Sequence, residues 1–365
     1  MHEGTQILMV AGGTGGHIFP ALAVAEELRA RRPYEIEFLG THRPLEAKLI
    51  PAAGFRLRAV DAAGLKGIGG FQRVRNLLIL PRTVVEVGQI LREFKPRAVL
   101  GVGGYLAGPA MLEAALLEIP TVLIEPNVRP GLTNRLLAPM VRAAALGFAE
   151  TVDLYGAKAH FTGLPVRRAF FQIPPRTVSP AGAAPFSLLV VGGSQGSRAV
   201  NKAVVEAAPL LLRQAGEMKI VHQTGEHDYG EVSSAYRERK LPVEVHAFID
   251  DMPGKLAQAD LVVSRAGATA VTELAAAGRA AVLIPFPGAT DQHQLENARA
   301  LERAGAARVI VQRELTPQKL AQEILDLMVQ RETLERMETC VRQFARPDAA
   351  ARIADLVERF VRQEQ

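Results

Sequence analysis

Two glycine-rich segments follow apolar runs and have the composition of phosphate-binding loops. Residues 7–10 lead into GGTGGH at 12–17, and residues 188–191 lead into GGSQGS at 192–197, an offset of 192 − 12 = 180 residues. Glycine turns let the backbone approach a ligand, and the helix that follows directs N–H groups toward an anion. Either loop alone is equally well explained as a tight connection. The pair, together with GVGGYLAGP at 101–109, favours a ligand that carries phosphate.

The glycine spacings do not fit two common nucleotide motifs. The dinucleotide fingerprint G-x-G-x-x-G needs a glycine where this chain has Ile18, and the P-loop pattern G-x-x-x-x-G-K-[ST] does not occur. These spacings disfavour a nicotinamide-dependent dehydrogenase and a P-loop nucleotide hydrolase.

His17 stands at the end of the first loop, where a neutral imidazole could act as a general base. The positive end of a helix dipole disfavours the imidazolium, and a neutral ring can take a proton from a hydroxyl. The alternative is a ring that hydrogen-bonds a backbone carbonyl and only holds the turn.

Two segments of the second half could bind a nucleotide sugar. SRAGATAVTE at 264–273 follows an apolar run, and its Glu273 could accept both hydroxyls of a ribose. PFPGATDQHQ at 285–294 places amide and imidazole groups after another run, an array that suits sugar hydroxyls. Taken singly, Glu273 could also be a solvated helix residue and 285–294 a polar loop.

Short apolar runs alternate with helical patterns along the chain, which is typical of βα units around a parallel sheet. Expected strands cover 6–11, 36–41, 98–103, 121–125 and 143–148, and a second series covers 186–193, 219–224, 243–249, 261–264 and 280–286. Between them, 174–185 is rich in turn formers and is expected in or near a linker. A helix is expected after Pro347. These patterns predict an α/β chain with two Rossmann-like halves.

Composition narrows the classes of partner. The chain has 365 residues, with 43 Lys and Arg against 38 Asp and Glu, and the formal charge of +5 suggests anionic partners. Only 5% of residues are aromatic and none is Trp, which argues against a nucleic-acid-binding surface. The single cysteine, Cys340, excludes a disulfide framework. We expect neither a signal peptide nor a membrane span, because no run reaches roughly 20 apolar residues.

Seven motifs in order resemble one family. They are GGTGGH at 12–17, GVGGYLAGP at 101–109, EPN at 125–127 with GLTN at 131–134, GLPVR at 163–167, GGSQGS at 192–197, SRAGATAVTE at 264–273 and DQHQ at 291–294. This set is similar to that of the bacterial undecaprenyl-diphospho-muramoylpentapeptide β-N-acetylglucosaminyltransferases of peptidoglycan synthesis. Pro126 departs from the glutamine usual there, and His293 from the glutamine of some members.

The resemblance implies a GT-B fold, with two Rossmann-like parallel-sheet domains facing across a cleft. It implies an inverting transfer of GlcNAc from UDP-GlcNAc to the C4 hydroxyl of MurNAc in lipid I (the undecaprenyl-diphosphate-linked MurNAc-pentapeptide), giving lipid II and UDP. The expected domains are 1–163, on the acceptor and membrane side, and 164–346, which would bind UDP-GlcNAc; the helix 347–365 is expected to pack back on the first.

The resemblance also assigns site residues by position. His17 would be the catalytic base. The residues that would bind the donor are Thr14, Gly15, Gly16, Ser194, Gln195, Gly196, Ile249, Arg265, Ala268, Thr269, Glu273, His293 and Gln294. Those that would bind the acceptor are Gly103, Gly104, Tyr105, Glu125, Asn127 and Arg167. No cofactor and no metal are expected, and the absence of a D-x-D pair agrees with this.

A lipid-linked acceptor requires access to a membrane. Apolar and basic residues interleave over 65–82, and they could form a patch for an anionic membrane surface or simply be core: Leu65, Lys66, Ile68, Phe71, Arg73, Arg75, Leu77, Leu78, Leu80 and Arg82. Pro81 is expected to interrupt this segment, and Val84, Val87, Leu91 and Phe94 beyond it to be core. We expect peripheral association with the cytoplasmic face of the bacterial cell membrane.

Two other functions use similar features. A UDP-GlcNAc 2-epimerase would share the nucleotide site but need no lipid acceptor, and the motifs GVGGYLAGP and EPN with GLTN favour the transferase. A nucleotide-sugar-binding regulator would need no base, so His17 in the half opposite the donor motifs weakens that alternative.

Overall fold

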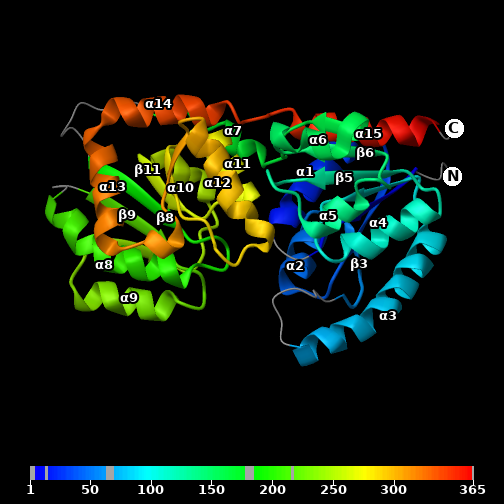
Figure 1. Cartoon of the computed structure of the whole chain (residues 1–365), viewed down its shortest axis with the longest axis horizontal. Coiled ribbons are helices and arrows are strands. Elements are labelled where there is room, and N and C mark those ends of the chain that lie inside the picture. Colours follow the sequence, from blue (N-terminus) through cyan, green and yellow to red (C-terminus); the bar gives the residue numbers. More distant parts are fainter. Residues whose placement is uncertain (1–4, 13–14, 63–69, 177–184, 215–217, 364–365) are drawn as a thin grey trace. The chain divides into compact units, whose positions relative to one another are not determined.

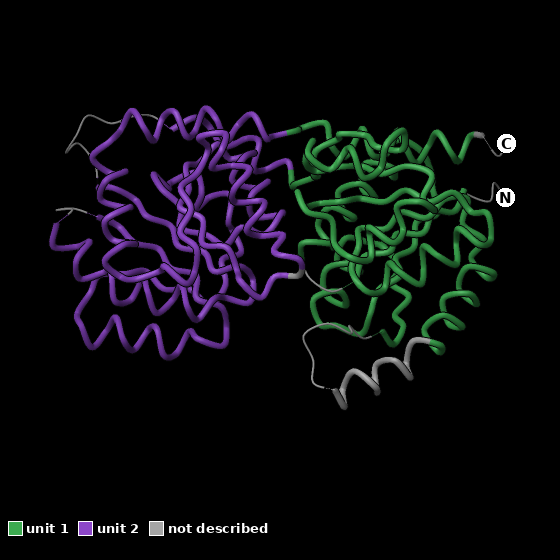
Figure 2. The backbone as a smooth tube through the Cα atoms, viewed as in Figure 1, with its two compact units in different colours: residues 1–167, 346–365 green, residues 168–345 purple. Residues whose placement is uncertain are grey.

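The computed structural model describes residues 5–12, 15–62, 70–176, 185–214 and 218–363 (Figure 1). The chain forms two compact units, coloured separately in Figure 2. Unit 1 comprises residues 1–167 and 346–365, and unit 2 comprises residues 168–345. The turn-rich stretch 174–185, expected in or near a linker, therefore falls inside unit 2.

Unit 1 is built on a parallel sheet with the described strand order β3-β2-β1-β4-β5-β6-β7. The strands are β1 (Gln6–Val10), β2 (Glu35–Gly40), β3 (Arg56–Ala59), β4 (Ala98–Gly101), β5 (Thr121–Glu125), β6 (Ala143–Leu146) and β7 (Ala159–Phe161). The helices are α1 (Gly15–Arg31), α2 (Pro44–Ala52), α3 (Gly70–Phe94), α4 (Ala107–Leu116), α5 (Leu132–Leu137), α6 (Val152–Tyr155) and α15 (Ala349–Gln363). The central strands β1, β4 and β5 are mostly apolar because helices cover both faces of such a sheet.

Unit 2 repeats this plan with the described order β10-β9-β8-β11-β12-β13, again all parallel. Its strands are β8 (Phe186–Val191), β9 (Met218–Gln223), β10 (Val243–His246), β11 (Leu261–Ser264), β12 (Ala281–Leu283) and β13 (Ala307–Val309). Its helices are α7 (Arg168–Phe171), α8 (Arg198–Gln214), α9 (Tyr229–Glu238), α10 (Met252–Gln258), α11 (Ala268–Ala277), α12 (His293–Arg303), α13 (Pro317–Val329) and α14 (Arg331–Arg342). The two parallel-sheet halves predicted from the sequence are confirmed.

The structure corrects two details. Three strands that the apolar runs did not predict, β3, β7 and β13, lie at sheet edges. Helix α3 runs through Pro81 without a break. Proline removes one helical hydrogen bond, a loss that the remaining turns of this 25-residue helix tolerate. Val87, Leu91 and Phe94 are buried as expected, whereas Val84 is 37% exposed.

The C-terminal helix α15 packs against α1 within unit 1. Arg31 of α1 donates to the Asp355 carboxylate at 2.6 Å, and the Tyr34 hydroxyl donates to Glu358 at 3.0 Å. Val357 and Ile353 of the same helix are fully buried. The chain therefore returns to its first unit after completing the second.

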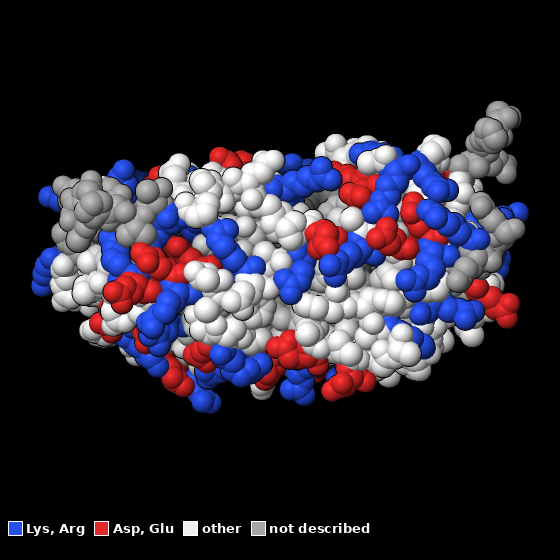
Figure 3. Space-filling model, turned by 90° about the horizontal axis from the view of Figure 1, so that it is seen from above, with Lys and Arg blue, Asp and Glu red and all other residues white. Residues whose placement is uncertain are grey.

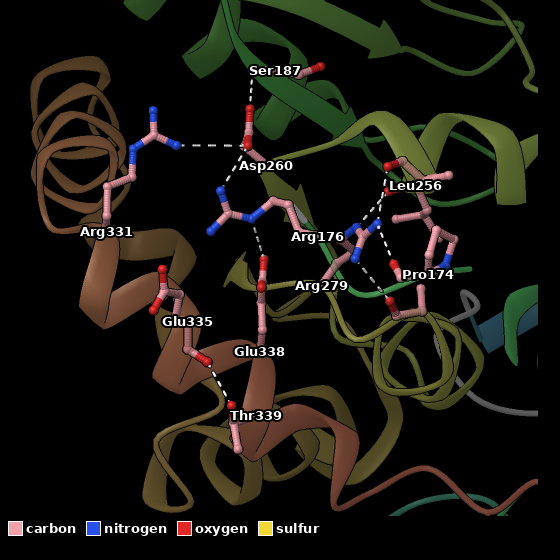
Figure 4. A network of polar contacts seen from close by, with 12 residues as sticks. Pro174, Arg176, Ser187, Leu256, Asp260, Arg279, Arg331, Glu335, Glu338 and Thr339 are labelled. Atoms are coloured by element: carbon pink, nitrogen blue, oxygen red, sulfur yellow. Dashed lines mark hydrogen bonds and ion pairs between the residues drawn. The ribbon is translucent and has the colours of Figure 1, made fainter. Parts of the chain in front are cut away.

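A buried polar network anchors the start of unit 2 (Figure 4). Arg176 donates to Asp260 at 3.0 Å and to Glu338 of α14 at 2.8 Å. The guanidinium of Arg279, which is 1% exposed, donates to backbone carbonyls of Leu256, Ala277, Pro174 and Ala257. Segment 174–176 is thereby held against β11, α10 and α14.

The structure bears on three expectations: the absence of a membrane span, the positive surface charge and the patch over 65–82. In the described part of the chain, no helix combines the length and apolarity that crossing a bilayer requires. Lysines and arginines alternate with acidic residues over the face drawn in Figure 3, so the positive charge forms no single stripe there. The patch expected over 65–82 falls outside what can be described, since residues 63–69 and the side chains of 70–80 are not placed.

Candidate functional site

Each sheet has a point where its strand order reverses, and the glycine motifs lie there. In unit 1 this point falls between β1 and β4, and in unit 2 between β8 and β11. The loops that leave the carboxyl ends of such a strand pair diverge and open a crevice, which is where open α/β sheets bind ligands. Residues 11–12 and 102–106 occupy that position in unit 1, and 192–197 and 265–267 occupy it in unit 2.

His17 lies in the first turn of α1, with its ring turned back to the loop. Its Nδ1 is 3.2 Å from the carbonyl oxygen of Gly12. Because a carbonyl only accepts, Nδ1 carries the hydrogen in the neutral ring and the basic lone pair is on Nε2. The bond that holds the turn therefore also fixes the tautomer a general base needs. Gly15 and Gly16 begin the same helix, and Thr14 lies outside the described residues.

The second glycine loop lies against the first. Gly103 and Gly104 adopt φ of +92° and +83°, and a Cβ on Gly104 would lie 3.3 Å from the Gly12 oxygen and 3.6 Å from the His17 ring. Tyr105 follows, and burial raises the pKa of its phenol. Arg167 is exposed and places its guanidinium 5.6 Å from the ring centre of Phe19, two residues beyond His17 on α1. The structure thus gathers Gly103, Gly104 and Arg167 near His17.

Glu125 ends β5 and is fully buried. Its carboxylate accepts hydrogen bonds from the Asn127 N–H at 2.9 Å and from Asn134 Nδ2 at 2.7 Å. Burial raises the pKa of Glu125 to about 7 against these bonds, which lower it. Asn134 Oδ1 is buried without a hydrogen-bond partner among the described residues, so a turn of this amide would offer an acceptor to protonated Glu125. Glu125 thus holds the backbone at Asn127 in place through a hydrogen bond.

The raised pKa of Glu125 makes the stability of unit 1 depend on pH. The folded carboxyl binds its proton more tightly than the unfolded one, so its contribution is complete below about pH 4.5 and is lost as pH rises through about 7. The loss should be about 3 kcal/mol. Glu125→Gln should remove this dependence, as measured by exchange of β4 and β5 amides in wild type and variant at pH 4.5 and 8. If the free energies of unfolding of the two proteins differ by the same amount at both pH values, this prediction is wrong.

In unit 2 the loop 192–197 connects β8 to α8. Ser194 and Gln195 are exposed at its tip. Gly196 has φ of +74°, and a Cβ there would lie 1.9 Å from the carbonyl oxygen of Thr224, so the loop is seated directly on the turn after β9. This close approach fixes where the loop amides lie.

Arg265 is buried behind the same loop. Its guanidinium donates to Ser197 Oγ at 2.7 Å, to Gln312 Oε1 at 2.7 Å and to the Ile284 carbonyl at 2.9 Å. Burial lowers its pKa to about 10, which leaves it charged at neutral pH. The three partners of the guanidinium are neutral groups: a hydroxyl, an amide oxygen and a backbone carbonyl. These hydrogen bonds tie Ser197, at the end of the loop, to Ile284 and Gln312.

The remaining predicted donor residues on α11 and α12 lie in the first turns of those helices or, for Glu273, within the second turn. Ala268, Thr269 and Glu273 are on α11, which begins after Gly267, and Thr269 and Glu273 are partly exposed. Gln294 accepts a hydrogen bond from the Phe286 N–H at 3.0 Å.

Two further observations constrain these segments. Ile249 is buried, and its N–H donates to Gln223 Oε1 at 3.0 Å. Asp291 and Gln292, just before His293, have φ of 53° and 57°, a strained backbone of the kind found at binding sites.

Sequence reasoning missed Gln223 and Gln312, which bond to Gly193 and Arg265. It gave no individual role to Ser197 or Asn134, although both lie inside motifs, GGSQGS and GLTN. The available signal for Gln223 was the polar sequence HQTG at 222–225, unusual at the end of a buried strand. Within the described residues, no group of three or more His, Cys, Asp or Glu is placed to hold a metal ion.

The comparisons with known proteins agree across the whole chain. The glycosyltransferase family 28 N-terminal domain matches residues 7–146, and the C-terminal domain of that family matches residues 187–353. A relative from Solibacter usitatus, a UDP-N-acetylglucosamine–N-acetylmuramyl-(pentapeptide) pyrophosphoryl-undecaprenol N-acetylglucosamine transferase, is 43% identical over 97% of this chain and 96% of its own.

Two solved structures place the fold. The crystal structure of Acinetobacter baumannii MurG has a TM-score of 0.76 and 32% identity, covering 97% of this chain and 99% of that one. A UDP-GlcNAc 2-epimerase from Neisseria meningitidis, at 14% identity and a TM-score of 0.70 over 97% of this chain and 100% of its own, shares the fold alone. The expected GT-B fold is confirmed. This chain belongs to glycosyltransferase family 28, in the family of N-acetylmuramyl-(pentapeptide) pyrophosphoryl-undecaprenol N-acetylglucosamine transferases.

Proposed function

We propose that this protein transfers GlcNAc from UDP-GlcNAc to the C4 hydroxyl of MurNAc in lipid I, with inversion, forming lipid II and UDP. The observation that carries the proposal is 43% identity to a transferase of this activity across 97% of the chain. The motif loops at the strand-order reversal of each sheet, with the His17 tautomer fixed, support it.

The reaction requires one in-line displacement. The C4 oxygen of the acceptor forms a bond to the anomeric carbon, the bond from that carbon to the diphosphate oxygen breaks, and its electron pair leaves with UDP. His17 Nε2 takes the hydroxyl proton, since Nδ1 donates to Gly12. The charge that develops on the diphosphate is stabilised by the amides of 192–197, the positive end of α8 and the guanidinium of Arg265.

The other predicted residues take roles that fit their positions. On the donor, Ser194, Gln195 and Gly196 contact the diphosphate, Glu273 accepts the ribose hydroxyls, and the Ile249 carbonyl accepts the N3–H of uracil. Ala268 and Thr269 line this site at the start of α11, and His293 and Gln294 contact the sugar. Thr14, Gly15 and Gly16 belong to the donor set on the unit 1 side.

On the acceptor, Gly103, Gly104 and Tyr105 border His17, with Asn127 and Arg167 as polar contacts. The buried carboxylate of Glu125 acts by holding Asn127.

A transfer assay tests this function directly. Purified protein is mixed with UDP-GlcNAc labelled in the sugar, a lipid I analogue and EDTA, and label is followed into the lipid fraction. Acceptor-dependent transfer is the expected result. Conversion of UDP-GlcNAc to UDP-ManNAc without transfer would identify an epimerase, and binding without either product would leave a regulator.

We also propose peripheral binding to the cytoplasmic face of the membrane through a leucine surface on α4 and α5. Two i, i+4 pairs, Leu112 with Leu116 and Leu132 with Leu136, are 41% to 71% exposed on two helices that pack together, and Met140 adds to them. Arg129, Arg135 and Arg142 are exposed in the same part of the chain and suit anionic headgroups. A lipid-linked acceptor lies at such a surface.

Two acidic substitutions should weaken this association. Leu116→Glu with Leu136→Glu removes two apolar contacts and adds two negative charges, and we expect binding to phosphatidylglycerol vesicles to fall at least tenfold. Sedimentation with vesicles measures this. The control pair Leu154→Glu and Val329→Glu, at sites 43% and 75% exposed, should bind like wild type. Equal losses in both pairs would reject the leucine surface.

A further inference from the structure

Gln223 joins two segments of the donor site through one side chain. It is the last residue of β9 and is 2% exposed. Its Nε2 donates to the Gly193 carbonyl at 3.1 Å, and its Oε1 accepts from the Ile249 N–H at 3.0 Å. Gly193 belongs to the loop proposed to bind the diphosphate, and Ile249 to the segment proposed to meet the base.

We infer that Gln223 is a positioning residue that sets the spacing between the diphosphate loop and the base-binding segment of the donor site. This inference rests on the proposed function. A nucleoside diphosphate spans the two segments, so their separation must match the distance between its base and its phosphates. A buried amide that bonds to both keeps them in that relation before the donor arrives.

The chemistry of the bridge requires an amide. A backbone carbonyl only accepts and a backbone N–H only donates, so the bridge needs a donor and an acceptor on one short planar group. Glutamate would keep the acceptor toward Ile249 but lose the donor toward Gly193, and methionine would supply neither at similar size. Glutamate therefore removes the bond to Gly193 alone, and methionine removes both bonds.

The neighbouring contacts leave Gln223 little freedom to move. The 192–197 loop rests on the turn that follows Gln223, where a Cβ on Gly225 would lie 2.4 Å from the Gln195 oxygen. His222 occupies the other face of the strand, where its ring bonds to the Tyr236 hydroxyl at 2.9 Å and to Asn201 at 3.1 Å. Tyr236→Phe thus removes a buried hydrogen bond beside Gln223 without touching the bridge, and serves as the matched control.

Binding of uridine, UMP and UDP to the full chain tests the inference by calorimetry. Gln223→Glu should bind uridine within about twofold of wild type and UDP about tenfold more weakly. Gln223→Met should bind uridine five- to tenfold more weakly and UDP thirtyfold or more weakly. In the transfer assay, both Gln223 variants should show a higher KM for UDP-GlcNAc, whereas their kcat should stay within threefold of the wild-type value. Tyr236→Phe should lower the melting temperature and leave nucleotide affinity unchanged.

Other outcomes would reject the bridge. If both Gln223 variants lower the affinities for uridine and UDP by one common factor, or if neither variant lowers them, the side chain does not couple the two segments. If Tyr236→Phe changes affinity as they do, the effect is general to the core of unit 2. If wild-type protein binds no uridine nucleotide and transfers no sugar, the proposed function fails instead.

Discussion

Replacing His17 by alanine should slow transfer of GlcNAc by about 10² to 10⁴-fold, the usual contribution of a general base. The imidazole is held in one tautomer by its Nδ1–H bond to Gly12, so its Nε2 is the atom that receives the C4 hydroxyl proton. The binding of UDP should remain close to wild type, because the diphosphate, ribose and base contacts are proposed on unit 2. Calorimetry for UDP and the lipid-fraction assay measure the two quantities separately.

A second variant distinguishes catalysis from support of the turn. In His17→Asn the side-chain amide can still donate to the Gly12 carbonyl from about the position of Nδ1, but it offers no basic nitrogen. We therefore expect His17→Asn to regain the stability that His17→Ala loses, while its transfer activity stays as low as that of His17→Ala. Recovery of activity in His17→Asn would show that the ring only holds the turn.

The sequence predicts the interior of both sheets and one edge strand, β10, but misses the other three edge strands. Strands such as β5 and β11 are buried on both faces and contain runs of three apolar residues, and their bounds match the prediction. The edge strands β3, β7 and β13 have only three or four residues and include Arg or His side chains. Their place in the sheet depends on hydrogen bonds to a neighbouring strand, which apolar periodicity does not record.

The candidate site shows the same division. The glycine loops and His17 could be found because their residue types imply their chemistry. Gln223 acts on backbone groups brought from other parts of the chain, 26 residues away at Ile249 and 30 at Gly193. A buried amide has no spacing pattern of its own, so its role follows only from the fold. Arg265 lies between these cases: its position was predicted, but its bonds to Ser197, Ile284 and Gln312 were not.

Gly196→Ala should disable the donor site more completely than any side-chain removal in the same loop. A Cβ at Gly196 would lie 1.9 Å from the Thr224 carbonyl oxygen and 2.9 Å from the Gly225 Cα, both backbone atoms that cannot rotate away. The φ of +74° adds strain of about 1 kcal/mol for any L side chain. The loop must therefore lift from the turn after β9, and the amides proposed to bind the diphosphate move with it.

The expected result is a fall in UDP affinity of at least a hundredfold, with a loss of unit 2 stability of about 3 kcal/mol from strain and overpacking together. Gly305→Ala is the matched control, because Gly305 has a φ of +69° but a Cβ there would meet only Cys340 Sγ at 3.8 Å. That variant should lose about 1 kcal/mol and bind UDP normally, since it carries the backbone strain without the overlap. Thermal unfolding with and without UDP measures both effects. If the two variants lose equal stability and both are still stabilised by UDP, the contact between Gly196 and Thr224 does not determine the shape of the donor site.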